Sequence, residues 1–345
     1  MAPAPGPPLR EMAEQNNNSS VDYKEQQERD NRRIDPISRA KYFLVRSTII
    51  WLGRIAAVLP EKTTYAACVR LTLFAHKRLP KFRNLARRHL EIAFGAEKTP
   101  DEIDDILRRT YISYGKSLAE FLMLPHKSKE WIESRVILDD PNWYVRTEHE
   151  KGRGVIALGG HFGSWELVGA RLGIYKYPIV VVVKAQRDAI MTRFVMETRN
   201  KWGNEYIFRD RGIKEECIKQ LDNGKILGLM ADQNATRGVI VNFFGKPAQT
   251  ATGPAAIAMQ RKMPVIPAFP YRNPDNTITM QTMKPIEMRD TGNYEEDLIY
   301  NLQQCSDAIE KFARVHPEEY LWWHKRWKGA EKKQASDAKT QLEES

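Results

Sequence analysis

The stretch Gly154–Glu166 constrains the fold of this chain more than any other. A short apolar segment runs into two glycines and then His161, and an amphipathic segment, 165–175, comes next. This order predicts a buried strand, a tight turn and a helix, with Ser164 as the N-cap and Glu166 in the first helical turn. In open α/β sheets, ligands bind outside the carboxyl ends of the strands, where such turns lie.

His161 and Glu166 form a candidate acid–base pair. Five positions along one continuous helix would hold the two side chains about 140° apart. Across a strand-to-helix turn, however, the chain can fold the carboxylate back onto the imidazole. Glu166 would then fix the tautomer of His161, which can take a proton from a hydroxyl. The alternative is a capping histidine beside an acidic residue at a helix N-terminus, since both features are common.

The composition narrows the class of partner. The formal net charge of +10 indicates a polyanionic partner, which can be nucleic acid, an anionic membrane surface or an acidic protein. No apolar run reaches the length that spans a bilayer without charge, and the N-terminus carries no cleavable signal pattern. The cysteines are too far apart for a metal or redox motif, at positions Cys68, Cys217 and Cys305.

The segment 42–59 is the candidate membrane contact. It is strongly apolar but contains Arg46 and Arg54, which fall on one helical face. A spanning helix would bury two arginines at a cost of several kcal/mol, whereas an interfacial helix keeps them among the headgroups with Trp51 toward the lipid. The alternative is a core helix of a soluble bundle, with arginines whose charged ends reach the solvent.

The rest of the chain alternates between helical and strand patterns. Helices are expected throughout 62–124 and at 141–151, 189–202, 212–221, 251–261 and 294–315. Strands are expected at 136–138, 154–158, 178–184, 205–208, 226–230, 239–244, 265–272 and 278–283. These patterns predict an α/β fold with a mixed central sheet flanked by helices, behind an N-terminal helical layer.

Four regions follow from these patterns. Residues 1–35 are polar and predicted to be disordered, as is the charged tail 329–345. Residues 36–135 form the helical, membrane-associated region, and 136–328 form the α/β catalytic region. We expect 36–328 to fold as one compact domain.

A tryptophan-rich segment closes the folded part. Trp322, Trp323 and Trp327 interleave with four basic side chains. This combination suits a membrane interface, where indoles lie at headgroup level and cations meet phosphates. Single-stranded nucleic acid, and a packing corner with a solvated basic side, are the alternatives.

Several ordered blocks between residues 40 and 328 resemble the bacterial lipid A biosynthesis acyltransferase family, the late lauroyl and myristoyl transferases. The blocks are 160–166; Arg199 with Gly203; Asp232–Gln233 with Gly238–Val239 and 243–245; Thr250 with 253–255; 267–272; and Trp323-x-x-Arg326-x-Lys328. Arg87–Phe94 also resembles the family's basic helix, and Glu120 its acidic position. The resemblance implies a fold like that of glycerolipid acyltransferases.

The resemblance also implies an activity. The family transfers a fatty acyl chain from an acyl thioester, carried by acyl carrier protein or CoA, to a hydroxyl of a lipid A precursor. It acts at the cytoplasmic face of the bacterial inner membrane, so a peripheral or monotopic protein is expected. The implied partners are the thioester carrier, an anionic glycolipid and the membrane surface, with no nucleic acid, no metal and no cofactor beyond the thioester.

Residue roles carry over from the matched blocks. His161 matches the catalytic histidine, Glu166 the acid of its dyad and Arg199 a basic residue of the active-site pocket. Asp232 and Gln233 match the family's Asp–Gln pair, which we interpret as structural support of the site.

Further substrate contacts are expected around this dyad. Backbone N–H groups at Gly163 and Ser164, or Arg199, are candidates for holding the oxyanion. Lys184 and Arg187, together with Arg199, are candidates for contacts with phosphate.

The chain departs from the family pattern at two places, and two alternative functions stay open. Lys184 stands where the family commonly has arginine, and Arg46 and Arg54 stand where many relatives have a spanning helix. The first alternative is the same chemistry on another glycolipid or polar lipid with acyl-CoA, as in the related mycobacterial mannoside acyltransferases. The second is a non-catalytic membrane-binding homologue. A serine hydrolase is excluded because no Gly-x-Ser-x-Gly elbow is present.

Overall fold

The computed structural model describes residues 36–140, 144–152, 154–174, 179–184, 189–209, 212–236 and 238–330. The disorder expected for 1–35 and for the part of 329–345 beyond Ala330 lies outside these residues, as does the phosphate contact expected of Arg187. Gly329 and Ala330 are helical and Ala330 is buried, so the expectation of disorder is wrong for these two residues. The described chain divides into two compact units, Met1–Trp51 with Ala185–Glu197, and Leu52–Lys184 with Thr198–Ser345. The boundary expected between residues 135 and 136 stays a prediction.

The first unit holds the beginnings of two helices, α2 (Pro36–Val58) and α9 (Ala189–Asn200). Within it, Arg46 Nη2 lies 3.0 Å from Glu197 Oε2, so this arginine is paired with a carboxylate. The apolar side chains Phe43, Leu44 and Trp51 are exposed on α2. None of the helices in the described residues is long and apolar enough to cross a membrane.

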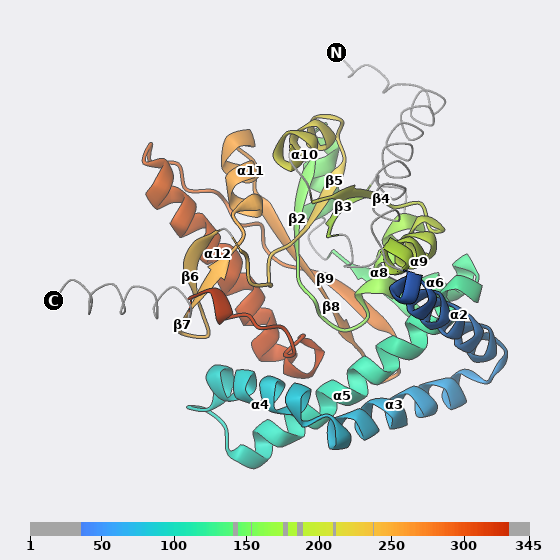
Figure 1. Cartoon of the computed structure of the whole chain (residues 1–345). Coiled ribbons are helices and arrows are strands. Elements are labelled where there is room, and N and C mark those ends of the chain that lie inside the picture. Colours follow the sequence, from blue (N-terminus) through green and yellow to red (C-terminus); the bar gives the residue numbers. More distant parts are fainter. Residues whose placement is uncertain are drawn as a thin grey trace, which may run out of the picture. The chain divides into compact units, whose positions relative to one another are not determined.

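The second unit is built on a seven-stranded sheet with the order β1-β9-β8-β2-β5-β3-β4 (Figure 1). The strands are β1 (Val136–Asp139), β9 (Ile278–Thr282), β8 (Val265–Arg272), β2 (Val155–Gly159), β5 (Ile226–Met230), β3 (Ile179–Val183) and β4 (Glu205–Phe208). Among the described strand pairs of this sheet, β8 and β9 are antiparallel and the others are parallel. The near-continuous apolar strands suit the parallel part, where both faces are covered. The expected mixed sheet flanked by helices is therefore confirmed.

A small hairpin, β6 (Val239–Phe243) and β7 (Lys246–Thr250), stands beside this sheet. Phe244 and Gly245 both have positive φ, which is the backbone of a two-residue hairpin turn. The sequence predicted β6 but not β7, because Lys246-Pro247-Ala248 lacks a strand-like apolar pattern.

Three long helices form the layer that precedes the sheet, α3 (Glu61–Arg78), α4 (Pro80–Phe94) and α5 (Pro100–Met123). Figure 1 shows them gathered at one end of the sheet. A capping box between Thr99 and Glu102 begins α5. A buried ion pair between Glu120 and Arg272, with Nη1–Oε1 and Nη2–Oε2 distances of 2.5 and 2.9 Å, ties α5 to β8.

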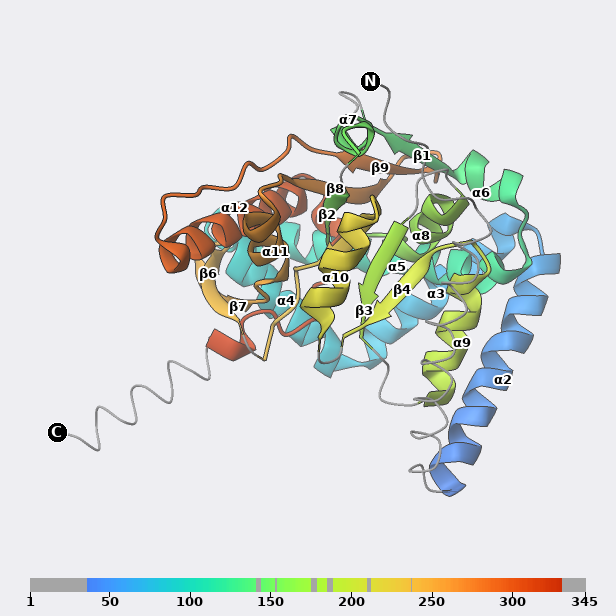
Figure 2. The same cartoon turned by 90° about the horizontal axis from the view of Figure 1, so that it is seen from above.

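The remaining helices cover the sheet (Figure 2). They are η1 (Leu124–His126), α6 (Lys129–Arg135), α7 (Tyr144–Glu150), α8 (Trp165–Ile174), α10 (Ile213–Asp222), α11 (Gly253–Arg261), α12 (Tyr294–Val315) and η2 (Pro317–Glu319). The main hydrophobic core joins side chains of α4, α5, the central strands and α12, among them Phe94, Leu107, Leu158, Leu229, Phe269 and Phe312.

The tryptophan-rich segment packs into this core. Trp322 is 1% exposed and Trp327 3%, and their indole N–H groups donate to the carbonyls of Pro317 and Phe243. The membrane contact expected of Trp322 and Trp327 is therefore wrong, because both rings are buried in protein. Trp323 is half-buried and donates to the Tyr111 hydroxyl at 3.1 Å.

Candidate active site

The turn after β2 faces the turn after β5. The two strands are parallel neighbours, and Gly159 lies opposite Met230 in their register. Two residues further along each chain come His161 and Asp232. Because the carboxyl ends of parallel strands meet at the same edge of a sheet, the register brings this histidine and this carboxylate together.

Asp232 holds His161 at two points. Its Oδ1 lies 2.8 Å from His161 Nδ1, and its Oδ2 accepts the backbone N–H of His161 at 2.8 Å. The carboxylate is only 2% exposed. Since an ionised carboxylate can only accept, it places the proton of the neutral imidazole on Nδ1 and leaves Nε2 unprotonated.

Nε2 is the chemically open end of the ring. The Gln233 side-chain nitrogen lies 3.3 Å from it and can donate to it. The edge-on ring of Trp165, with a centroid distance of 5.3 Å, packs against the imidazole. The histidine side chain remains 21% exposed. The geometry therefore presents a fixed nitrogen base with a hydrogen-bond donor beside it.

The electrostatics of the pair agree with this geometry. Burial alone would lower the pKa of His161, but the charge and hydrogen bond of Asp232 outweigh it and raise that pKa, with Glu166 adding to the effect. Burial of Asp232 opposes its ionisation, yet His161 and its hydrogen bonds hold the pKa of this carboxyl below its usual value. The protonated imidazole is therefore stabilised at the moment it takes a proton.

Glu166 does not bind the imidazole in this structure, contrary to the expected dyad. Its two oxygens accept the fork of Arg199, with Nε–Oε2 and Nη2–Oε1 distances of 2.9 and 2.5 Å. The Trp165 indole N–H also donates to Oε1 at 3.2 Å. Arg199, in the last turn of α9, has a planar guanidinium that matches both carboxylate oxygens of Glu166. Because Glu166 makes no hydrogen bond to the imidazole, its effect on the pKa of His161 comes through its charge.

The backbone of the turn is fixed at Gly163. Its φ is +43°, and a Cβ there would lie 2.5 Å from a carboxylate oxygen of Glu319. Its N–H donates to the Glu319 carbonyl at 2.8 Å, so this N–H is already occupied and the oxyanion role expected of it is not supported. Ser164 is buried, and its carbonyl accepts from Val168 N as an N-cap carbonyl does.

A contact of Ser164 with substrate stays a prediction. Lys184 is exposed directly after β3, and no contact with phosphate is tested for it either.

The C-terminal segment and α5 donate hydrogen bonds to the backbone carbonyls of His161 and Asp232. Leu321 N donates to the His161 carbonyl at 3.1 Å, and Tyr114 of α5 donates to the same carbonyl at 3.3 Å. The Tyr320 hydroxyl donates to the Asp232 carbonyl at 3.2 Å. Sequence reasoning assigned neither tyrosine to the site, because only the folded chain brings them to it.

Arg326 anchors the loop that carries Asp232 and Gln233. Its Nη1 donates to the carbonyls of Gln233 and Gln249 at 3.3 and 3.0 Å, and its Nη2 to the Thr250 hydroxyl at 2.6 Å. The side chain is almost fully buried. The Trp-x-x-Arg block of the sequence is thus explained as a tether between the C-terminal segment, β7 and the Asp–Gln pair.

Comparisons with known proteins point to one family. A family model described as bacterial lipid A biosynthesis acyltransferase matches residues 11–329. The phosphatidylinositol mannoside acyltransferase of Mycolicibacterium smegmatis is 26% identical over 52% of this chain and 60% of that protein. The lipid A biosynthesis acyltransferase of Haemophilus influenzae is 22% identical over 79% of this chain and 85% of that protein. The lipid A biosynthesis lauroyltransferase of Escherichia coli is 22% identical over 82% of this chain and 92% of that protein.

Proposed function

The chain belongs to the bacterial lipid A biosynthesis acyltransferase family and is an acyltransferase, and we propose that it moves a fatty acyl chain from an acyl thioester to a hydroxyl of a lipid A precursor. The observation that carries the proposal is the 2.8 Å contact between His161 Nδ1 and Asp232. This contact leaves Nε2 free of a proton, so Nε2 can act as a base in the turn at the carboxyl ends of the parallel strands. The donor is an acyl thioester of acyl carrier protein or CoA.

The reaction needs one base and no covalent enzyme intermediate. The acceptor hydroxyl gives its proton to His161 Nε2 as its oxygen attacks the thioester carbonyl. Asp232 keeps the ring oriented and stabilises the imidazolium that forms. The tetrahedral intermediate then expels the thiolate, which takes the proton from Nε2 to become the free thiol, and the new ester remains on the lipid.

Two side chains are candidates for stabilising the oxyanion. The Gln233 amide lies beside Nε2, so a donor is already present where the thioester carbonyl would meet the base. Arg199 retains N–H groups beyond the two that bind Glu166. A single such donor is typically worth about 3 kcal/mol of the barrier. In this proposal Glu166 is a positioning residue, which holds Arg199 and raises the pKa of His161.

Since the proposed acceptor is a membrane lipid, we also propose that the protein acts at a membrane surface, the cytoplasmic face of the inner membrane. The exposed apolar side chains of α2, including Trp51, support an interfacial helix with Arg46 and Arg54 near the headgroups. A carbonate or high-salt wash would release such a protein in good part. Retention until detergent is added would argue for a spanning anchor instead.

The alternative acceptor is another glycolipid or polar lipid, acylated from acyl-CoA by the same chemistry. The similarity to the mannoside acyltransferase supports it over about half of this chain, whereas the similarity to the lipid A enzymes extends over about four fifths. The net charge of +10 suits anionic acceptors of either kind.

An acyl-transfer assay on the purified full-length chain tests the proposal. Labelled acyl–acyl carrier protein and acyl-CoA are offered as donors, with a Kdo-bearing lipid A precursor or a phospholipid mixture as acceptor. His161→Ala should abolish transfer, and His126→Ala, an exposed histidine of η1, should leave it unchanged.

The acceptor that is labelled decides between the alternatives. Transfer only to a different lipid would keep the mechanism and replace the substrate. No transfer to any acceptor by the folded wild-type chain would refute the catalytic proposal.

A further inference from the structure

The turn between α3 and α4 exposes a group of large apolar side chains. Leu71 and Phe74 on α3, Leu79 at the turn and Phe82 on α4 are between 48% and 58% exposed. We call these four residues the corner patch. Contiguous exposed apolar surface on a folded protein typically marks a site of interaction with another surface.

The patch lies on the side of α3 that is turned away from the protein. The opposite side packs closely on α5, where the Thr72 hydroxyl donates to the Tyr111 carbonyl at 2.7 Å. A Cβ at Gly115 would lie only 2.7 Å from Val69 Cα, so the two helices are already in contact there. Leu71 and Phe74, three residues apart, share the outward face by helical periodicity.

The stretch of chain that carries the patch is strongly basic. From residue 62 to residue 90 the chain has no acidic residue but eight cations, which are Lys62, Arg70, Lys77, Arg78, Lys81, Arg83, Arg87 and Arg88. Most of them are exposed. The Arg78 guanidinium lies over the Phe74 ring at 5.6 Å, so the apolar and cationic parts form one surface.

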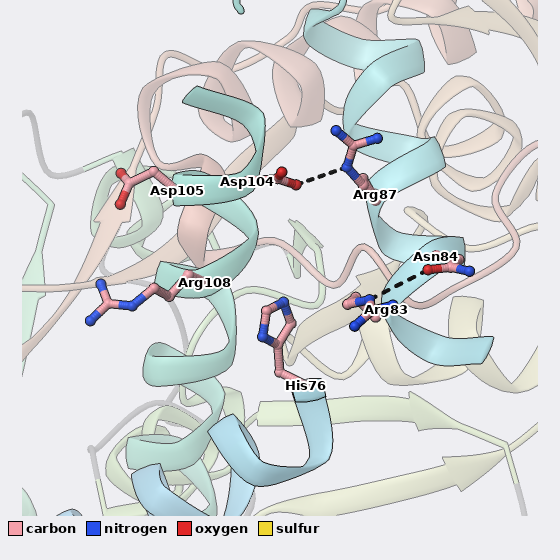
Figure 3. A pocket seen from close by; sticks show the side chains of 7 residues that line it. All are labelled: His76, Arg83, Asn84, Arg87, Asp104, Asp105 and Arg108. Carbon is pink, nitrogen blue, oxygen red and sulfur yellow. Dashed lines mark hydrogen bonds and ion pairs between the residues drawn. The ribbon is translucent and has the colours of Figure 1, made fainter. Parts of the chain in front are cut away.

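A hollow of about 570 Å³ adjoins the turn between α3, α4 and α5. Its lining comprises His76, Arg83, Asn84, Arg87, Asp104, Asp105 and Arg108 (Figure 3). Arg87 is paired with Asp104 at 2.8 Å, and Asp105 with Arg109 at 2.8 Å. Burial, with a smaller contribution from the charge of Arg83, lowers the pKa of His76, while Asp104 opposes this shift.

We propose that the corner patch is the surface with which this protein binds an anionic lipid bilayer. Leu71, Phe74, Leu79 and Phe82 enter the interface, while the surrounding lysines and arginines meet lipid phosphates. Large apolar side chains ringed by long cationic ones suit such an interface, because the cations reach the phosphates while their stems lie in the apolar layer.

The position of the patch connects it to the candidate active site. α5 packs against α3, and Tyr114 of the same helix donates to the carbonyl of His161. Docking through α3 and α4 would therefore fix the active site relative to the bilayer that holds a lipid acceptor. This consequence rests on the proposed function, whereas binding of the patch to lipid does not.

Vesicle flotation with the full-length protein tests the proposal. The vesicles are phosphatidylglycerol with phosphatidylcholine, or phosphatidylcholine alone. Phe74→Ser/Phe82→Ser should weaken binding to the anionic vesicles about tenfold or more, because two half-exposed rings are lost from the interface. Lys77→Glu/Lys81→Glu should weaken it by at least about 20-fold, and added salt should reduce wild-type binding.

A matched control carries the same kinds of change elsewhere. Ile299 of α12 is 48% exposed and Lys246 of β7 is exposed, so Ile299→Ser/Lys246→Glu should bind as the wild type does. Circular dichroism and a thermal melt establish that each variant folds. The lysine variant, with only surface charges changed, keeps the test valid if the phenylalanine variant does not fold.

The results separate three cases. Wild-type binding by both folded corner variants would overturn the proposal. If the corner variants lost binding to an acidic acyl carrier protein but still bound vesicles, the corner patch would be a protein-binding surface. That result would also overturn the proposal. His161→Ala should bind vesicles as the wild type does, because His161 lies outside the corner patch. Loss of vesicle binding by the corner variants would therefore support the corner patch even if the protein transferred no acyl group.

Discussion

Asp232→Asn tests the assignment of the partner of His161. In the wild type, one oxygen of Asp232 binds the ring nitrogen and the other accepts the backbone N–H of His161, both at 2.8 Å. An amide has one oxygen and one NH₂ group, so it cannot accept at both points. If its oxygen keeps the backbone N–H, its NH₂ group faces Nδ1 and favours the tautomer with the proton on Nε2. That tautomer is no base for the acceptor hydroxyl.

The magnitude follows from two losses. A hydrogen bond to a charged group is worth about 1.5–3 kcal/mol, which corresponds to roughly 10- to 150-fold in rate. The wrong tautomer adds to this, and the corresponding change in a serine-protease triad costs about 10⁴-fold in kcat. We therefore expect Asp232→Asn to lower kcat by about 10³-fold or more in the acyl-transfer assay. The KM should change much less.

The pH profile provides a second readout. In the proposed mechanism activity requires unprotonated His161, so kcat/KM should fall as the pH drops through the pKa of His161. Asp232 raises that pKa, so in Asp232→Asn the acidic limb of the residual activity should move to lower pH. An Asp232→Asn protein that folds normally and keeps more than about a tenth of wild-type kcat, with its acidic limb unmoved, would refute the assignment.

Three further predictions concern neighbouring groups. Glu166→Gln should lower kcat/KM about 10- to 100-fold, through its weakened fork with Arg199, and parallel assays would contradict this if the loss matched or exceeded that of Asp232→Asn. Arg272→Met should destabilise the protein by about 3–5 kcal/mol in urea unfolding, since it leaves Glu120 buried without its cation; a loss below about 1 kcal/mol would contradict the importance given to this ion pair. Gly163→Ala should lower the melting temperature and the activity together, because the turn has positive φ and no room for a Cβ, and a fully active, equally stable variant would be inconsistent with the turn described.

The fold was predictable because the strand signals are strong. Apolar runs such as 179–183 and 226–230 are followed within two residues by a charged side chain, and the structure has strands there. The hairpin strand 246–250 was missed because it is formed by the turn at Phe244 and Gly245, and its own composition does not favour a strand. The tryptophan-rich segment was assigned to the membrane because composition alone cannot distinguish an interfacial cluster from a buried one.

The site was predictable only as a set of residues. His161, Glu166, Arg199, Asp232 and Gln233 were all singled out, but the carboxylate bound to the imidazole was misassigned. Proximity in sequence favoured Glu166, whereas the parallel register of β2 and β5 brings Asp232 opposite the histidine. That register depends on the strand order, which a single sequence does not contain. Two polar residues at equal offsets after neighbouring strands were the signal that could have identified the pair.

The most direct test of the account is the protonation state of His161. Nitrogen-15 NMR of the histidine-labelled protein, with His161→Gln to assign its signals, reports the tautomer and the pKa of this ring. We predict the neutral form with its proton on Nδ1 and a pKa above the ordinary value of about 6.5. A neutral form protonated on Nε2, or a pKa below that value, would contradict the claim that Asp232 makes His161 Nε2 the base of this enzyme.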